Sequence, residues 1–224
     1  MTLTAIIVTG FAIDTAFIIT DYMKKYIPAV ILKTLASLVF VYLGIYCAQL
    51  AGGGTYAHLI IAGLALGCAG DFFLNLRFVS SKYDEMCLKT GTAFFFAGHA
   101  VYIAAALISG SRVYIAALPM SLVLCLTIIT ILLRKIDVKK ELKPLGIIYF
   151  IIMISTFSFA AGLLIMTGAT EFTKLLAAGA FIFIISDILY ILTQFGKIKR
   201  SCYNAANLIT YYIAQVMIAL TIAL

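Results

Sequence analysis

Hydrophobic residues form eight long runs along this chain, and short polar segments separate them. A helix needs about 20 predominantly apolar residues to span the hydrocarbon core of a bilayer. The runs are continuous, whereas the strands of a membrane barrel alternate between apolar and polar residues. We therefore expect an all-α membrane protein, a bundle of about eight transmembrane helices. The expected helices cover residues 3–20, 27–49, 57–76, 91–108, 113–133, 144–166, 172–193 and 203–223.

The composition strengthens this assignment. Of 224 residues, 64% are hydrophobic and 11% are charged, whereas soluble domains carry about 25% charged residues. Eight spans leave no room for a soluble domain, so we expect residues 1–224 to form a single transmembrane domain. The first run lacks a cationic start and a clear cleavage site, and we expect it to be retained. The cysteines show neither C-x-x-C spacing nor a disulfide framework: they are Cys47, Cys68, Cys87, Cys125 and Cys202.

Basic residues are concentrated in every second loop. The first, third, fifth and seventh loops hold 13 of the 16 lysines and arginines, and the other loops hold only Arg112 and Lys174. The positive-inside rule then places these four loops in the cytoplasm and both termini outside it. We expect a multi-pass protein of a bacterial cytoplasmic membrane. The four loops contain Lys24, Lys25, Arg77, Lys82, Lys89, Arg134, Lys135, Lys139, Lys140, Lys143, Lys197, Lys199 and Arg200.

The net charge of +7 follows from this topology and from attraction to anionic lipid. Because the basic residues are spread over four short loops, they do not suggest a nucleic-acid partner. The expected partners are membrane lipids, and the sequence leaves the oligomeric state open.

Three aspartates lie inside the apolar runs: Asp14, Asp71 and Asp187. A carboxylate in hydrocarbon is costly, and by default it marks a functional site. Two of them follow a small residue, as Gly70-Asp71 and Ser186-Asp187. A structural role for both would need two cations at that depth, and only Lys33 is obvious. Asp14 alone is more readily explained as a structural partner of Lys33.

Further polar residues lie at a similar depth, about 8 to 12 Å from the expected cytoplasmic helix ends at a rise of about 1.5 Å per residue. They are Lys33, His99, Tyr149 and Tyr211. Small residues share helix faces with Asp71, His99 and Asp187, which predicts that these faces contact neighbouring helices. Several interpretations stay open. Lys33 could snorkel to the interface, pair with Asp14 or contact a substrate phosphate. His99 and the tyrosines could serve packing alone.

Four sequence patches, in this order, carry a resemblance to a known family. They are Gly70-Asp71-Phe72-Phe73-Leu74, Gly91-x-x-Phe94-x-x-x-x-His99-x-x-Tyr102, Gly179-Ala180-x-x-Phe183-x-x-Ser186-Asp187 and Tyr211-Tyr212-x-x-Gln215. With these patches, the chain resembles the YhhN family of lysoplasmalogenase-like membrane proteins. Lys33 also resembles the family's lysine, although Thr34 follows it where the family often has a proline.

The resemblance implies hydrolysis of the vinyl ether bond of lysoplasmalogens, giving a fatty aldehyde and a glycerophospho-base. It implies that Asp71 and Asp187 are catalytic and that the substrate is a lysophospholipid. Acid–base chemistry of this kind requires no metal and no organic cofactor. The active site would open toward the cytoplasmic leaflet. The candidate substrate-binding residues are Lys33, Asn75, His99, Tyr102, Tyr149, Tyr190, Tyr211 and Gln215.

Two other functions remain as alternatives. Intramembrane carboxylates and a histidine also form proton relays, so the chain could be a proton-coupled transporter of a lipid or small molecule. Against this, the helices lack paired breaks near the midplane, because the only prolines, Pro28, Pro119 and Pro144, lie near expected helix ends. A non-catalytic lipid-binding scaffold is the third possibility, and it predicts that both aspartates can be replaced without loss of function.

Overall fold

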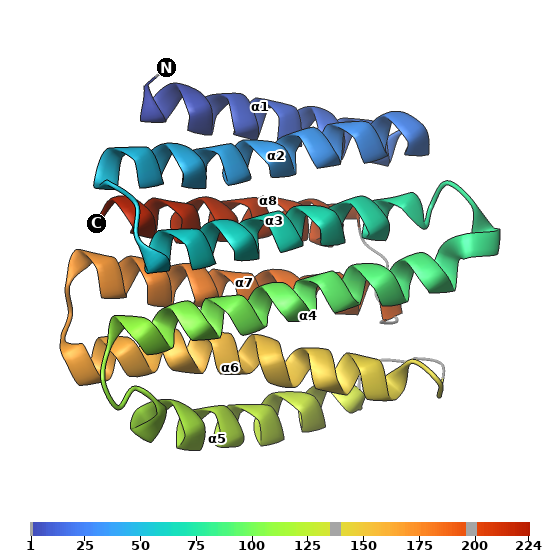
Figure 1. Cartoon of the computed structure of the whole chain (residues 1–224). Coiled ribbons are helices and arrows are strands. Elements are labelled where there is room, and N and C mark those ends of the chain that lie inside the picture. Colours follow the sequence, from blue (N-terminus) through green and yellow to red (C-terminus); the bar gives the residue numbers. More distant parts are fainter. Residues whose placement is uncertain (1, 135–139, 196–200) are drawn as a thin grey trace. The chain divides into compact units, whose positions relative to one another are not determined.

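The computed structural model describes residues 2–134, 140–195 and 201–224, and none of these residues forms a strand (Figure 1). Eight α-helices in this part of the chain are long and apolar enough to cross a membrane, which fits a multi-pass membrane protein. The all-α prediction is thereby confirmed. The helices are α1 (Leu3–Tyr22), α2 (Tyr26–Ala51), α3 (Thr55–Leu76), α4 (Asp84–Ser109), α5 (Tyr114–Leu133), α6 (Lys143–Thr167), α7 (Glu171–Phe195) and α8 (Ser201–Leu220), with short 3-10 helices η1 (Ser81–Tyr83) and η2 (Thr221–Ala223).

Seven of the helices begin and end within one turn of their expected bounds. The exception is α4, which we expected to begin at residue 91 and which begins at Asp84. Its first turn carries Asp84 and Glu85, whose charges favour a helix N-terminus. Glu85 also forms an ion pair with Lys89, one turn further along, with 2.7 Å between Oε1 and Nζ. Charged residues therefore extend this helix beyond the apolar run that predicted it.

The chain forms two compact units. Unit 1 runs to Val101 and includes Ile218–Leu224, and unit 2 covers Tyr102–Met217. The single-domain expectation remains a prediction. Five of the basic loop residues, Lys135, Lys139, Lys197, Lys199 and Arg200, lie outside the described residues.

In unit 1, α2 lies between α1 and α3, and η2 packs on α2 and α3. Fully buried apolar side chains such as Phe17, Phe40 and Leu64 fill this core. The Tyr56 and Thr221 hydroxyls lie 2.6 Å apart and tie η2 to the start of α3. Both termini lie at one end of unit 1, and the α1–α2 and α3–α4 connections lie at the other (Figure 1). How this end is oriented in a membrane remains a prediction.

Glycines bring α3 and α4 into backbone contact within unit 1. A Cβ on Gly98 would lie 3.2 Å from the Gly63 carbonyl oxygen, and a Cβ on Gly91 would lie 3.1 Å from that of Gly70. Larger side chains would therefore separate the two helices, as is usual for small residues at membrane-helix interfaces. The glycine faces expected for these two helices do lie at an interface, next to Asp71 and His99.

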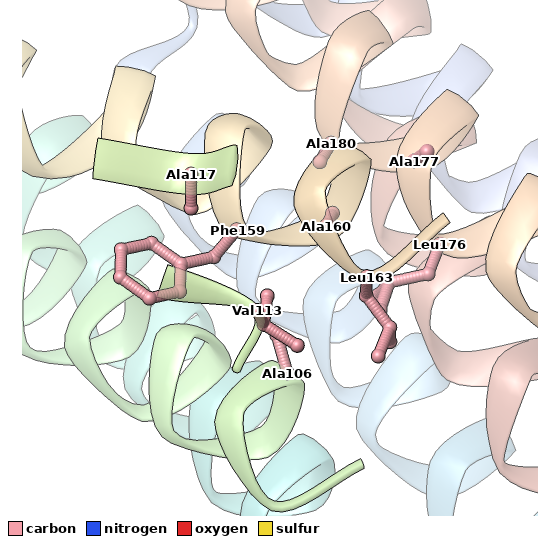
Figure 2. Close-up of a cluster of buried hydrophobic side chains, with 9 residues drawn as sticks. All are labelled: Ala106, Val113, Ala117, Phe159, Ala160, Leu163, Leu176, Ala177 and Ala180. Carbon is pink, nitrogen blue, oxygen red and sulfur yellow. The ribbon is translucent and has the colours of Figure 1, made fainter. Parts of the chain in front are cut away.

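In unit 2, α6 lies between α5 and α7. Its core includes a buried cluster of mostly small side chains (Figure 2). Small residues let the helices approach closely, and Gly162 on α6 lies directly against the backbone at the start of α5. A Cβ there would lie 3.0 Å from the Val113 carbonyl oxygen and 3.2 Å from both the amide nitrogen and the Cβ of Ala117. The cluster contains Ala106, Val113, Ala117, Phe159, Ala160, Leu163, Leu176, Ala177 and Ala180.

We predict that Gly162→Ala lowers the free energy of unfolding by about 1 to 3 kcal/mol, because the added methyl meets rigid backbone atoms. Gly146→Ala in the same helix is the matched control, since no atom lies within 4 Å of its Cβ position. That control should be neutral or stabilising by up to about 1 kcal/mol, because alanine favours a helix. Thermal unfolding in detergent measures both variants. Equal midpoints for the two would contradict the close α5–α6 contact.

Candidate functional site

Asp71 is held from the neighbouring helix α2. The carboxyl group lies on α3 and its residue is only 5% exposed. The Ser37 hydroxyl, on a fully buried residue of α2, donates a hydrogen bond to Asp71 Oδ2 at 2.5 Å. Ser37 stands one helical turn after Lys33, so both point from the same face of α2. The buried carboxyl oxygen thereby has a hydrogen-bond donor, which offsets the cost of removing it from water.

Lys33 forms a buried ion pair with Asp14 of α1. Both residues are 2% exposed, and Lys33 Nζ lies 3.7 Å from Asp14 Oδ1. The ammonium also lies 5.3 Å from the centroid of the Phe17 ring, a cation–π distance. The snorkelling interpretation of Lys33 is wrong, because the side chain does not reach a surface of the molecule. The pairing with Asp14 is confirmed, and a contact with substrate phosphate stays a prediction.

The ion pair and Asp71 belong to one buried cluster in unit 1. Cys68, one turn before Asp71 on α3, lies within electrostatic reach of both the Asp71 carboxylate and the Lys33 ammonium. On α2, Lys33 pairs with Asp14, and Ser37, one turn further along, bonds Asp71.

Asn75 and His99 accompany Asp71 in unit 1. Asn75 Nδ2 donates to the Asp71 backbone carbonyl at 2.9 Å, so this side chain acts on its own helix. His99 is 2% exposed and follows Gly98 at the close contact between α3 and α4. Their expected contacts with substrate remain predictions.

Asp187 is held from α6 in unit 2. The residue is 8% exposed, and the Tyr149 hydroxyl donates to Asp187 Oδ2 at 2.5 Å. The Tyr149 ring packs edge-on against Phe150, with centroids 6.4 Å apart. Tyr149, expected as a substrate contact, is therefore a direct partner of a candidate catalytic carboxyl group.

The residue before Asp187 is bonded to α8. Asn207 Nδ2 donates to the Ser186 carbonyl oxygen at 2.8 Å and to Ser186 Oγ at 2.9 Å. Ser186 Oγ in turn donates to the Asn207 carbonyl oxygen at 3.1 Å. Ser186 is fully buried and Asn207 is 5% exposed. Helices α7 and α8 are therefore joined by a reciprocal set of three hydrogen bonds.

Three further candidates meet in a buried chain of hydrogen bonds in unit 2. The Tyr102 hydroxyl donates to Gln215 Oε1 at 2.9 Å, and Gln215 Nε2 donates to the Tyr211 hydroxyl oxygen at 3.0 Å. The Tyr211 ring packs edge-on against Phe183 at 5.4 Å. These polar groups satisfy one another, which suits a structural role. Tyr190 is half-buried, and its carbonyl accepts a hydrogen bond from Thr193.

Sequence reasoning missed two residues beside the aspartates, Ser37 and Asn207. A signal was available for each. Ser37 lies one turn after Lys33, and Asn207 lies one turn before Tyr211 on the face that also carries Gln215. A polar residue that extends a polar face of an apolar helix is a candidate partner for a buried charge on the next helix.

Asp71 belongs to unit 1 and Asp187 to unit 2, and each has a hydroxyl donor from an adjacent helix of its own unit. A carboxyl group in a dry, hydrogen-bonded environment can donate or accept a proton. Among the described residues, no three histidine, cysteine or acidic side chains are grouped so as to hold a metal ion.

Comparison with known proteins identifies a family. The profile of the YhhN family matches residues 21–222, a range that includes Lys33, Asp71, His99, Asp187 and Gln215. No curated protein and no solved structure matches the chain.

We predict that Lys33→Met destabilises the protein by about 3 kcal/mol, because it leaves the Asp14 carboxylate buried without its cation. The double variant Asp14→Asn/Lys33→Met should recover much of this loss, since it removes both charges. The midpoint of thermal unfolding in detergent, measured for the wild type and the two variants, checks this coupling. A double variant no more stable than the single one would show that the two charges do not compensate each other.

Proposed function

We propose that this chain, which belongs to the YhhN family, is a membrane-embedded hydrolase that cleaves the vinyl ether bond of lysoplasmalogens. The products are a fatty aldehyde and a glycerophospho-base. Family membership supports the substrate class, and the two buried aspartates support the chemistry. The observation on which the proposal rests is that each aspartate is buried and hydrogen-bonded by a hydroxyl group at 2.5 Å.

Vinyl ether hydrolysis needs an acid, an anion and a water molecule. A carboxylic acid transfers its proton to the β-carbon of the double bond, which leaves an oxocarbenium ion. Water adds to this cation and loses a proton, which gives a hemiacetal. The hemiacetal collapses to aldehyde and alcohol, so one water is consumed and the proton is returned.

Asp71 and Asp187 divide these roles in our proposal. One is the proton donor, and the other is an ionised carboxylate that stabilises the cation and accepts a proton from water. Paired carboxylates of glycosidases act on an oxocarbenium-like transition state by the same logic. The surroundings of the two residues differ. Asp71 accepts a hydrogen bond from a serine one turn from a buried lysine, and Asp187 accepts one from a tyrosine. Different surroundings are what two different roles require.

The remaining candidates position groups around this chemistry. Tyr149 orients Asp187 through its hydroxyl group, and His99, Tyr102 and Tyr190 shape the substrate's surroundings. The head group stays at the cytoplasmic interface of a bacterial membrane, near the basic loops, while the first carbons of the chain reach the aspartates. The asymmetry of basic residues between loops supports this orientation.

We predict that Asp71→Asn and Asp187→Asn each lower turnover of a lysoplasmalogen by about 10²- to 10⁴-fold, because each removes a proton-transfer group or a stabilising charge. The matched control is Glu171→Gln, an equally conservative change at an 82% exposed carboxylate in the same helix as Asp187. Purified protein in detergent is given the vinyl ether lipid beside an ester lysophospholipid, and mass spectrometry identifies the products.

Fatty aldehyde from the vinyl ether lipid alone, lost in both aspartate variants and kept in the control, is the expected result. Normal turnover in folded Asp71→Asn and Asp187→Asn would refute the mechanism. A wild type that leaves both lipids intact, yet moves them across a proteoliposome membrane with a proton gradient, would favour the transporter alternative.

We also predict that Tyr149→Phe lowers kcat about tenfold, since about 1.4 kcal/mol of the stabilisation of Asp187 is lost from the transition state. KM should stay within about twofold, because the hydroxyl group contacts the carboxyl group and not the lipid. Tyr114→Phe, at a half-exposed tyrosine that begins α5, should leave both constants unchanged. A rise in KM at constant kcat would instead assign Tyr149 to substrate binding.

A further inference from the structure

Asn207 makes the most extensive polar contact beside Asp187, and no role has yet been assigned to it. Its side-chain amide nitrogen donates to two atoms of Ser186, the carbonyl oxygen and the hydroxyl oxygen. The Ser186 hydroxyl donates back to the Asn207 backbone. All these groups are buried, so the contact is made in a dry interior, where an unpaired polar group is costly.

The contact fixes the rotation of α7 about its own axis. Neighbouring residues on an α-helix point about 100° apart, so Ser186 and Asp187 face different neighbours. Ser186 is bonded to α8 through Asn207, and Asp187 is bonded to α6 through Tyr149. A rotation of α7 would therefore break both contacts together. With both made, the direction of the Asp187 carboxyl group is determined from two sides.

The same unit contains a comparable contact that lies away from the aspartate. The Ser121 hydroxyl on α5 and the Ser155 hydroxyl on α6 lie 2.9 Å apart. This contact also joins two helices and also involves a buried serine, Ser121, which is 8% exposed. Neither residue belongs to α7 or α8. Removing it separates the general effect of losing an interhelical hydrogen bond from an effect on Asp187.

We infer that Asn207 is a positioning residue for Asp187: through Ser186, it holds α7 at the rotation that keeps the Asp187 carboxyl group hydrogen-bonded to Tyr149. The inference deepens the proposed function and rests on it for its kinetic consequence. Its structural consequence, the orientation of Asp187, is measurable without substrate. Asn207 itself acts through Ser186 and has no proposed contact with lipid.

The first experiment compares Asn207→Ala with Ser121→Ala by steady-state kinetics on a lysoplasmalogen. We expect Asn207→Ala to lower kcat by about 10- to 100-fold, the range for misplacing a reacting group by about 1 Å. KM should stay within about twofold. Ser121→Ala should keep the wild-type kcat. A purely structural role predicts that both variants lose stability and that neither loses kcat once folded.

The second experiment reads the Asp187 carboxyl group directly. Infrared spectra of protein labelled with ¹³C at aspartate give the Asp187 band as the difference between the wild type and Asp187→Asn. Tyr149→Phe removes the hydrogen bond and defines the direction in which the band shifts. We expect Asn207→Ala to shift the band in that same direction and Ser121→Ala to leave it in place.

If Asn207→Ala does not fold, Ser186→Ala replaces it in this experiment. This variant removes only the hydroxyl contacts and keeps the hydrogen bond from the Asn207 side-chain amide to the Ser186 carbonyl oxygen. It should give a smaller band shift in the same direction. An unshifted Asp187 band in the folded variant, Asn207→Ala or Ser186→Ala, would overturn the positioning role. If the wild type leaves lysoplasmalogen intact, the proposed function fails, and the band shift alone then decides the inference about Asn207.

Discussion

The cost of placing a charge in hydrocarbon governs the interior of this protein. A buried carboxylate without a partner would cost several kcal/mol, yet the chain buries Asp14, Asp71 and Asp187 within helices long enough to span a membrane. Each faces a partner on an adjacent helix: Asp14 forms an ion pair with an ammonium group, and the other two accept a hydrogen bond from a hydroxyl group. The pairwise packing of α1 with α2, α2 with α3, and α6 with α7 therefore has both an apolar and a polar component.

Helix α2 illustrates how few residues this arrangement needs. Lys33 and Ser37, one turn apart on the same face of α2, contact carboxyl groups on its two neighbouring helices, α1 and α3. Glycines perform the complementary task, since α3 and α4, and likewise α5 and α6, approach closely at positions where a side chain is missing. Polar contacts fix the rotation of each helix, and small residues fix the distance between helices. A carboxyl group is held in one direction only when both are set.

The extent of the helices was predictable because apolar length alone decides what can span a membrane, and seven of the eight helices begin and end within one turn of the expected bounds. The start of α4 was not predictable from apolar length, because Asp84 and Glu85 stabilise a helix end without being apolar. The aspartates were identifiable as candidate functional residues because a carboxylate in hydrocarbon is costly. Their partners were not, because pairing depends on the rotation of two helices at once. Ser37 and Asn207 were therefore missed, and Tyr149 was assigned to substrate rather than to Asp187.

The ion pair between Asp14 and Lys33 also bears on how the chain enters a membrane. On insertion scales, a lysine or an aspartate in a lone helix costs up to about 2.5 to 3.5 kcal/mol, the value at the helix centre. In the folded protein, these two charges lie 3.7 Å apart on consecutive helices, whose short connection makes them neighbours as soon as both are synthesised. Insertion of α1 and α2 as one hairpin brings the opposite charges together and offsets a cost that each helix would meet alone. The contact that organises the interior of unit 1 thus also favours the insertion of α1 and α2 as a pair.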